Sequence, residues 1–322
     1  MQSRRAVLAT PFLLGLAAKG AAAQAYPARP VRIVVPFPPG GSTDITARLI
    51  AARLQEKWGQ SVVVDNRAGG DGIIGTSAVT QSAPDGYTLL LAASALPIAA
   101  AGRRRMPYDV EKDLAPITLL GTISNVLIVH ESVPARTVQE FVALARARPG
   151  ALNFASAGAS TGQRYAFELM KQQLGIDVVH VPFRGGAPAG QALISGQVES
   201  MIVNGLEAMP LIQTGKARPL AVTTKDRIPS LPDVPTLAET VMPGLDVSVW
   251  QAVFSRGGTP EPIIAKLNTD IRAVVAEPAV TQRMRELGLT VRTTSPAELG
   301  AFLKHELETW TRVARAAGIQ ED

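Results

Sequence analysis

The segment at residues 31–44, with the sequence VRIVVPFPPGGSTD, constrains the fold more than any other part of the chain. Its first residues, 31–35, are mostly apolar and β-branched, which fits a buried strand and is too short for a helix. Three prolines then end the strand, because proline cannot donate to a strand ladder, and a Gly-Gly pair allows a tight turn. Apolar residues at helical spacing follow as far as Trp58. We predict a strand, a glycine-rich loop and a helix capped by Ser42 or Thr43.

A loop of this kind suits an anion, because free amides gather at the positive end of a helix dipole. The alternative is an ordinary strand-to-helix turn without a ligand. The same theme returns later in the chain, with a short strand at 153–155, the small-residue loop SAGASTG at 156–162, and a helix from Tyr165 to Leu174. We expect two such loops to bind one anionic group between them.

Strands alternate with helical patterns along the chain, which favours parallel βαβ units. We predict an α/β protein of two lobes, with the second inserted into the first. The first domain comprises residues 26–121 and 223–322, and the second comprises residues 122–222. A double crossover of this type leaves a cleft at the hinge, where ligands usually bind.

Composition excludes several classes of protein. A hydrophobic content of 46% is ample for a packed core, and a charged content of 18% argues against disorder. The chain has no cysteine, and its three histidines do not stand at metal-ligand spacing, so we expect neither a metal nor a cofactor. No basic cluster is interleaved with aromatic residues, and the run at 103–105 reads as a solvated loop, so we expect no nucleic-acid partner.

Residues 1–25 have the pattern of a secretory signal peptide. Arg4 and Arg5 precede an apolar stretch at 6–18, and A-x-A cleavage sites follow it. That stretch is too short to span a bilayer. Without the leader, which holds three of the 32 basic residues, the net charge falls from +5 to +2. We expect a mature periplasmic protein that is monomeric.

Two further motifs point to functions that we reject or rank low. The G-x-G-x-x-G match at 70–75 begins several residues after the preceding strand, so it reads as a glycine turn and not as a dinucleotide site. The G-x-S-x-G match at 158–162 would make Ser160 a hydrolase nucleophile, with Asp246 and His305 following in the required order. However, His305 lies within a regular helical pattern instead of a loop.

The sequence resembles the Bug family, the periplasmic solute-binding subunits associated with tripartite tricarboxylate transporters. The resemblance runs over residues 26–319 and rests on segments that include YPARPVRIVVPFPPGGSTD, GQSVVVDNRAGGDGIIG, PDGYTLL and VPFRGGAPAGQALISGQVE. It implies a type-II periplasmic-binding-protein fold that binds a small carboxylate without catalysis. It also implies that amides and hydroxyls of the second-domain loop hold the carboxylate, while ordered waters bridge it to the first domain.

Residues at the matching positions form the predicted ligand site. In the first lobe they are Phe37, Pro38, Gly40, Gly41, Ser42, Asp44, Ala93 and Ser94. In the second lobe they are Ser156, Gly158, Ser160, Thr161, Gly162, Phe183, Arg184, Gly185 and Asn204. Three alternatives stay open: the hydroxyls at 156–161 as helix caps, Asp44 as a cap or ion-pair partner of the first helix, and Arg184 as a surface residue. Trp250 is expected to be a core or hinge residue.

Two departures from the family pattern bear on the ligand. Residues 93–98 read ASALPI where relatives carry a more polar run, and Asn204 stands where an aspartate is common. An aspartate there could hold an amino group, so we expect an acid with an apolar or aromatic body instead of an amino acid. We expect a transport protein that hands this acid to a membrane permease; a ligand-loaded sensor for a membrane receptor is the alternative, and a hydrolase at Ser160 ranks third.

Overall fold

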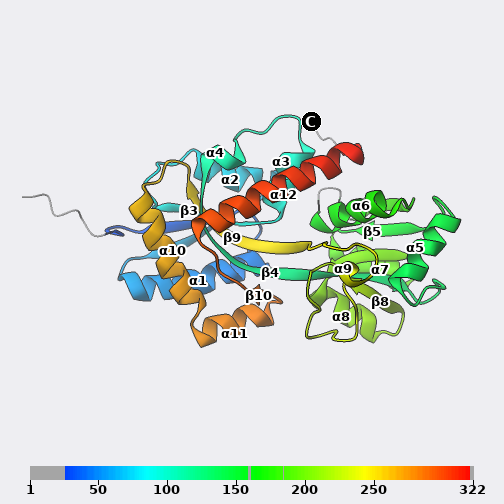
Figure 1. The fold of residues 1–322 in the computed structure, drawn as a ribbon. Helices are drawn as coiled ribbons and strands as arrows, with labels where there is room; N and C mark the ends of the chain where they lie inside the picture. The colour runs from blue at the N-terminus through cyan, green and yellow to red at the C-terminus, as the bar shows by residue number, and fades with distance from the viewer. Residues whose placement is uncertain (1–25, 159–160, 184, 320–322) are drawn as a thin grey trace, which may run out of the picture.

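The computed structural model describes residues 26–158, 161–183 and 185–319, and within them two α/β lobes lie side by side (Figure 1). Strands of the first lobe are β1 (Val31–Val35), β2 (Val62–Asn66), β3 (Thr88–Ala93), β9 (Ser248–Arg256) and β10 (Thr290–Val291). Its helices are α1 (Ser42–Trp58), the 3-10 turn η1 (Gly70–Gly72), α2 (Ile73–Thr80), α3 (Ala95–Gly102), α4 (Val110–Asp113), α10 (Glu261–Val275), α11 (Pro278–Glu286) and α12 (Pro296–Ala316).

The second lobe is built from the middle of the chain. Its strands are β5 (Asn153–Ser156), β6 (Val179–Pro182), β7 (Ser200–Asn204) and β8 (Ala217–Val222). Its helices are α5 (Val138–Ala147), α6 (Gly162–Leu174), α7 (Gly186–Ile194), α8 (Gly205–Gln213) and α9 (Leu237–Thr240). The predicted α/β class and the alternation of strands with helices are confirmed.

One strand, β4 (Leu114–His130), runs through both lobes. It pairs with β9 as far as Ser124 and with β7 from Asn125 onward, so the chain passes from one lobe to the other without leaving the strand. The strand order is β2-β1-β3-β9-β4-β7-β5-β6, with β8 and β10 also paired to β4. The parallel strands β1 and β3 of one lobe and β5 and β7 of the other therefore point their carboxyl ends at the space between the lobes.

Apolar side chains cover both faces of each half of the sheet. In the first lobe, α1, α10 and α11 pack on one face and α2, α3 and α12 on the other. In the second lobe, α5 and α6 pack on one face and α7 and α8 on the other. Trp250 on β9 is 0% exposed, which confirms its predicted place in the core. Gly70 and Gly72 form the predicted turn in η1, which leads into α2, whereas Gly75 lies within α2.

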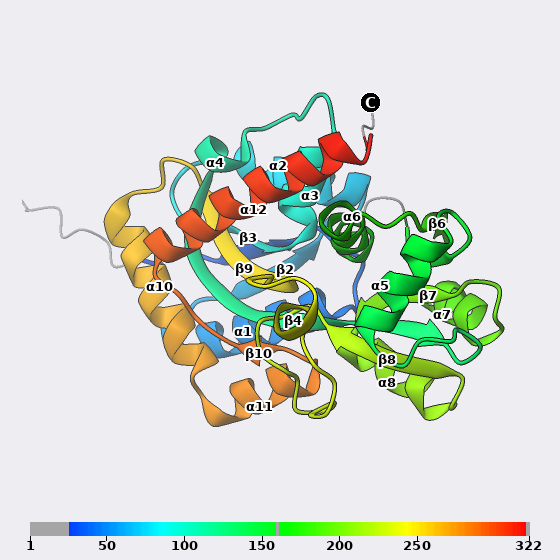
Figure 2. The same ribbon diagram turned by 45° about the vertical axis from the view of Figure 1, so that its right-hand side comes forward.

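Helix α12 reaches across both lobes. Leu299 and Leu303 pack in the first lobe, whereas Trp310 and Val313 belong to the apolar cluster of the second. Both views show the C-terminal end of α12 beside α6 (Figures 1 and 2). The prediction assigned the whole C-terminal segment to the first domain; its last turns pack with the second.

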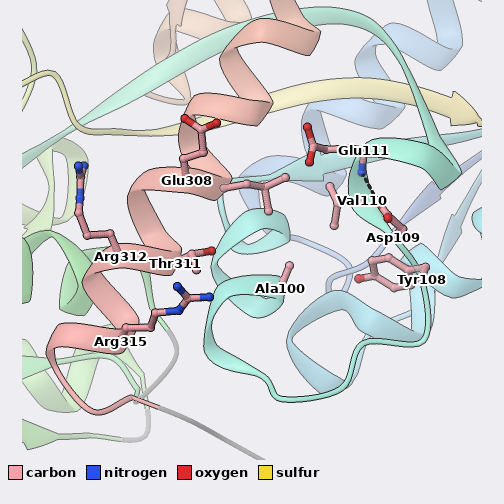
Figure 3. A pocket seen from close by; sticks show the side chains of 10 residues that line it. Ala100, Tyr108, Asp109, Val110, Glu111, Glu308, Thr311, Arg312 and Arg315 are labelled. Atoms are coloured by element: carbon pink, nitrogen blue, oxygen red, sulfur yellow. Dashed lines mark hydrogen bonds between the residues drawn. The ribbon is translucent and has the colours of Figure 1, made fainter.

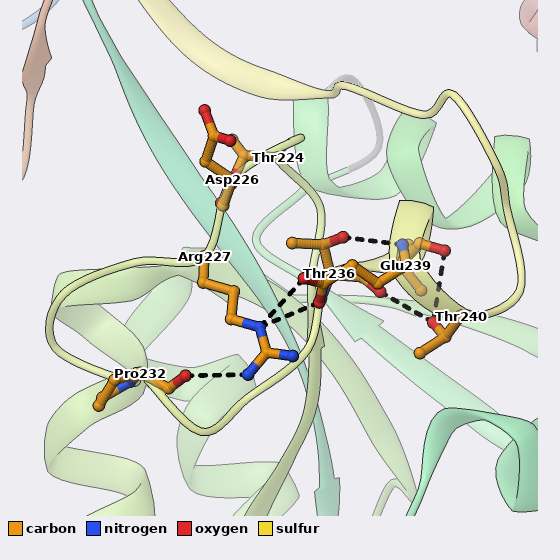
Figure 4. A network of polar contacts seen from close by, with 8 residues as sticks. Thr224, Asp226, Arg227, Pro232, Thr236, Glu239 and Thr240 are labelled. Carbon is orange, nitrogen blue, oxygen red and sulfur yellow. Dashed lines mark hydrogen bonds and ion pairs between the residues drawn. The ribbon is translucent and has the colours of Figure 1, made fainter.

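The return connection between the lobes is held by a polar network (Figure 4). A hydrogen bond of 2.9 Å links Thr224 Oγ1 to Ser124 Oγ on β4 and joins the two crossing segments. Arg227 pairs with Glu239, whose carboxylate also accepts from the amide of Thr236 in a capping box. These contacts order the connection at the hinge.

Within the described ranges, no helix has the length and hydropathy of a membrane span. The predicted leader lies outside them.

Candidate functional site

The first-lobe loop joins β1 to α1, and Gly41 is the N-cap of α1. No side chain caps this helix, so the prediction that Ser42 or Thr43 caps it was wrong. Instead, both hydroxyls lie near the side-chain amide of Gln251, with Nε2 at 3.3 Å from Ser42 Oγ and 3.5 Å from Thr43 Oγ1. The first amides of α1 are thus without the usual side-chain acceptor.

The buried carboxylate of Asp44 stabilises this loop through hydrogen bonds. Its carboxylate is 3% exposed and accepts hydrogen bonds from the Gly40 amide at 2.9 Å, from Arg48 Nε at 3.1 Å and from Asn66 Nδ2 at 2.9 Å. Burial by itself would raise the pKa of Asp44, but these hydrogen bonds outweigh it and the pKa lies below its ordinary value. Asp44 therefore acts as the ion-pair partner that the sequence suggested, and its charge is already compensated within the loop.

Gln251 is a candidate site residue that the sequence did not reveal. It is 1% exposed, and its Oε1 has no hydrogen-bond partner. Rotating the amide by 180° would turn Oε1 to the hydroxyls of α1 and leave Nε2 free, so one end of the amide lacks a partner in either orientation. The available signal was a polar residue within the apolar run at 249–254.

Asn125 is a second buried side-chain amide with an unpartnered oxygen, and it lies where β4 passes from the first lobe to the second. It is 1% exposed, its Oδ1 has no partner, and it lies opposite Asn204 in the β4–β7 pair. Buried polar groups without partners are uncommon, and a bound water or ion is one explanation for them. Asn204 itself accepts from the amide of Glu207 at 3.0 Å and caps α8.

The second-lobe loop joins β5 to α6, and Thr161 is the N-cap of α6. The Thr161 hydroxyl accepts from the Arg164 amide and donates to the Gly158 carbonyl at 3.1 Å. The Ser156 side chain is 0% exposed, with Oγ 2.8 Å from the same carbonyl and 2.6 Å from His180 Nε2. Both hydroxyls therefore serve the loop itself. The Gly162 and Gln163 amides, which come before Arg164 in the first turn of α6, precede the intrahelical ladder and remain as donors.

The two lobes meet at the end of the second-lobe loop, where it faces the start of α3. A Cβ added at Gly162 would lie 3.4 Å from Ile98 Cδ1 and 3.6 Å from Ser94 Oγ. The N-terminus of α6 thus packs against the N-terminus of α3, and the structure brings Ser94 and Gly162 together from opposite lobes. Ile98 is 1% exposed and belongs to the apolar cluster of the second lobe, so the contact opposite Gly162 is apolar.

The other predicted residues lie around these two loops. Phe37 is half-buried against the first-lobe core, and Gly40 and Gly41 are exposed beside it. Phe183 and Gly185 donate their amides to the carbonyls of Ser156 and Ala157, so the loop after β6 is joined to the loop after β5. Pro38 is exposed, and Ala93 is buried at the end of β3. Ser160 and Arg184 lie outside the described residues.

Two pockets lie away from these loops. One, of about 590 Å³, lies between α3, α4 and the C-terminal half of α12, with Tyr108 and Arg315 on opposite sides (Figure 3). The other, of about 600 Å³, lies at the hinge between α8 and β10 and includes Leu206 and Met209. None of the predicted ligand residues lines either pocket. Within the described ranges no group of three or more His, Asp or Glu side chains could hold a metal ion.

Comparison with known proteins decides the family. The family model described as the tripartite tricarboxylate transporter family receptor matches residues 46–319. The chain belongs to this family. BugT of Bordetella pertussis is 38% identical over 301 residues, which cover 92% of each protein.

Solved structures agree with this assignment. The structure described as R. palustris Rpa4515 with adipate is 37% identical with a TM-score of 0.76, and the match covers 92% of this chain and 99% of that one. MatC from Rhodopseudomonas palustris, solved with bound malate, is 33% identical with a TM-score of 0.72, covering 90% and 100%. The resemblance to the Bug family is confirmed, and this chain is a solute-binding protein instead of an enzyme, which removes the hydrolase at Ser160.

Proposed function

We propose that this chain is a periplasmic receptor that captures a small organic acid between its lobes and passes it to a membrane permease. The observation that carries the proposal is the meeting of Gly162 and Ser94, which places the start of α6 against the opposite lobe. A carboxylate bound there accepts hydrogen bonds from the first amides of α6, whose dipole favours negative charge.

Polar groups of the first lobe support a second contact, at the other end of the ligand. The Ser42 and Thr43 hydroxyls and the Gln251 amide supply polar partners there, while Ile98 contributes an apolar wall. We infer a ligand with a carboxylate at one end, an apolar middle and a second polar group. Adipate, named with Rpa4515, has this pattern, and malate, named with MatC, is a shorter and more polar diacid. At Asn204 no carboxylate is present to pair with an ammonium group, which disfavours amino acids.

Delivery to a permease fits the receptor family to which the chain belongs. The alternative is a loaded sensor that docks on a membrane receptor, and it uses the same cleft. Pull-down of membrane proteins with the ligand-loaded protein would separate the two: recovery of permease subunits supports transport, and recovery of a signalling receptor alone supports sensing. The signal-like leader at 1–25 supports export to the periplasm.

A thermal-shift series followed by calorimetry tests the ligand class. The series contains adipate, malate, hexanoate, benzoate and aspartate. We expect adipate to raise the melting temperature, because a ligand bound only to the folded state stabilises it by mass action. NMR of the released acid should show it unchanged. Tight binding of aspartate with none of the other four acids would contradict the proposed ligand class, and binding of none of the five would contradict the proposed function.

A further inference from the structure

His180 stands next to the second-lobe loop, on the neighbouring strand. In the parallel pair of β5 and β6, His180 lies opposite Phe154, two residues before Ser156. Its ring is tilted against the Phe154 ring at a centroid distance of 4.8 Å, and Phe154 stacks in turn on Phe167 at 3.9 Å. This packing fixes the ring with Nε2 at 2.6 Å from Ser156 Oγ.

The direction of the hydrogen bonds follows from the groups involved. The Gly158 carbonyl can only accept, and it lies 2.8 Å from Ser156 Oγ, so the single hydroxyl proton of Ser156 points to it. His180 must then donate through Nε2–H to a lone pair of Ser156. Burial, together with the charges of Arg164 and Lys171, lowers the pKa of His180 to about 4, so the ring is neutral near pH 7 and carries its one proton on Nε2.

We propose that His180 is a positioning residue for ligand binding: it orients Ser156, and Ser156 with Thr161 holds the Gly158 carbonyl, so that the first amides of α6 face the cleft. This inference rests on the proposed function. Two hydroxyl groups converge on one carbonyl oxygen, at 2.8 Å and 3.1 Å, and close the turn between β5 and α6. The ligand carboxylate is then bound by backbone amides and not by the hydroxyl protons of Ser156 or Thr161.

Two substitutions at His180 separate hydrogen bonding from packing. His180→Phe keeps a ring against Phe154 and removes the donor, whereas His180→Gln keeps an Nε–H donor and removes the ring. With adipate as the probe in calorimetry, we expect His180→Phe to raise Kd roughly tenfold and His180→Gln to raise it less than about threefold. If His180 acted through packing alone, His180→Gln would raise Kd more than His180→Phe. That result would overturn the inference.

A third variant tests whether His180 acts through Ser156. Because both residues belong to one chain of hydrogen bonds, Ser156→Ala should weaken adipate binding in the wild-type background and add little in the His180→Phe background. Additive losses would show that His180 acts independently of Ser156 and would contradict the proposal. Circular dichroism spectra and melting curves establish that each variant is folded.

Measurements without ligand keep this inference separate from the proposed function. Nitrogen-15 NMR of the wild-type protein at pH 7 should show the neutral Nε2–H tautomer of His180, and amide exchange at 156–158 should be faster in His180→Phe. The Nδ1–H tautomer, or unchanged exchange in His180→Phe, would overturn the inference. If the wild type binds no carboxylate, the proposed function fails, while the tautomer and exchange rates still decide how the loop is ordered.

Discussion

Glu306 joins the helix that spans the lobes to the core of the first lobe. Its Oε2 atom accepts from Trp250 Nε1 at 2.8 Å and from Trp310 Nε1 at 3.0 Å, and the side chain is 8% exposed. Trp310 continues the contact into the second lobe, where its ring meets Tyr165 edge-on at 6.0 Å. We predict that Glu306→Leu destabilises the protein and that Glu306→Gln does not.

The magnitude follows from the two indole groups. Glu306→Leu leaves two buried N–H donors without an acceptor, each costing about 1–3 kcal/mol. Removal of a buried carboxylate offsets part of this cost, so we expect a net loss of about 2–4 kcal/mol. For a chain of this size that corresponds to a fall in melting temperature of roughly 3–6 °C. Glu306→Gln retains a carbonyl oxygen for both indoles and should change stability by less than about 1 kcal/mol.

The pH dependence gives a second test of this prediction. Burial is the main cause that raises the pKa of Glu306 above its ordinary value of 4.5. The native state therefore holds this proton more tightly than the unfolded state, so the stability that it contributes is present below pH 4.5 and is lost as pH rises through the folded pKa. Glu306→Gln lacks this loss, and its stability relative to wild type should increase with pH.

Urea unfolding and calorimetry between pH 4 and 8 measure these effects. Glu308→Leu, an exposed site on the same helix, is the matched control and should change stability by less than about 0.5 kcal/mol. The reasoning is refuted if Glu306→Leu is as stable as wild type, or if Glu306→Gln is destabilised as much as Glu306→Leu.

Three further predictions concern the two loops. Gln251→Leu should raise Kd for adipate roughly tenfold without lowering the melting temperature of the unliganded protein, because it removes a buried carbonyl oxygen that lacks a partner. Gln173→Leu, at an exposed position of α6, is the control, and a lower melting temperature without a change in Kd would contradict this. Asp44→Asn should cost about 1–3 kcal/mol at pH 7 in urea unfolding. Because the pKa of Asp44 lies below 3.8, that contribution is lost as pH falls through the folded pKa, so equal differences at pH 7 and pH 2 would refute it. Gly162→Val should weaken adipate binding at least about tenfold in calorimetry, because its branches meet Ile98 across the cleft, and unchanged affinity would show that the lobes do not close there.

Local pattern was sufficient to predict most of the architecture. The apolar runs and glycine-rich loops predicted the strands and helices around both loops, because these depend on periodicity and turn chemistry within a few residues. The cap of α1 was mispredicted because Ser42 and Thr43 turn to Gln251, which is about 200 residues away in the chain. A sequence pattern within a few residues cannot indicate a contact with so distant a residue.

The same limit explains the other differences. The periodicity of α12 predicts an amphipathic helix, but its last turns pack on the second lobe through Trp310, and only the folded chain shows which core that residue meets. The sequence also suggested Ser156 as a ligand donor, which stays a prediction. Its contact with His180 depends on the pairing of β5 with β6, which places the two side chains together.

A crystal structure of the protein with adipate tests the central claim most directly. We predict one carboxylate within about 3 Å of the first amides of α6, at Gly162 and Gln163, and the other end of the acid near Ser42 and Gln251. The acid should be chemically intact. Adipate bound in the hinge pocket beside Leu206 and Met209, with the space between the two loops empty, would contradict the account.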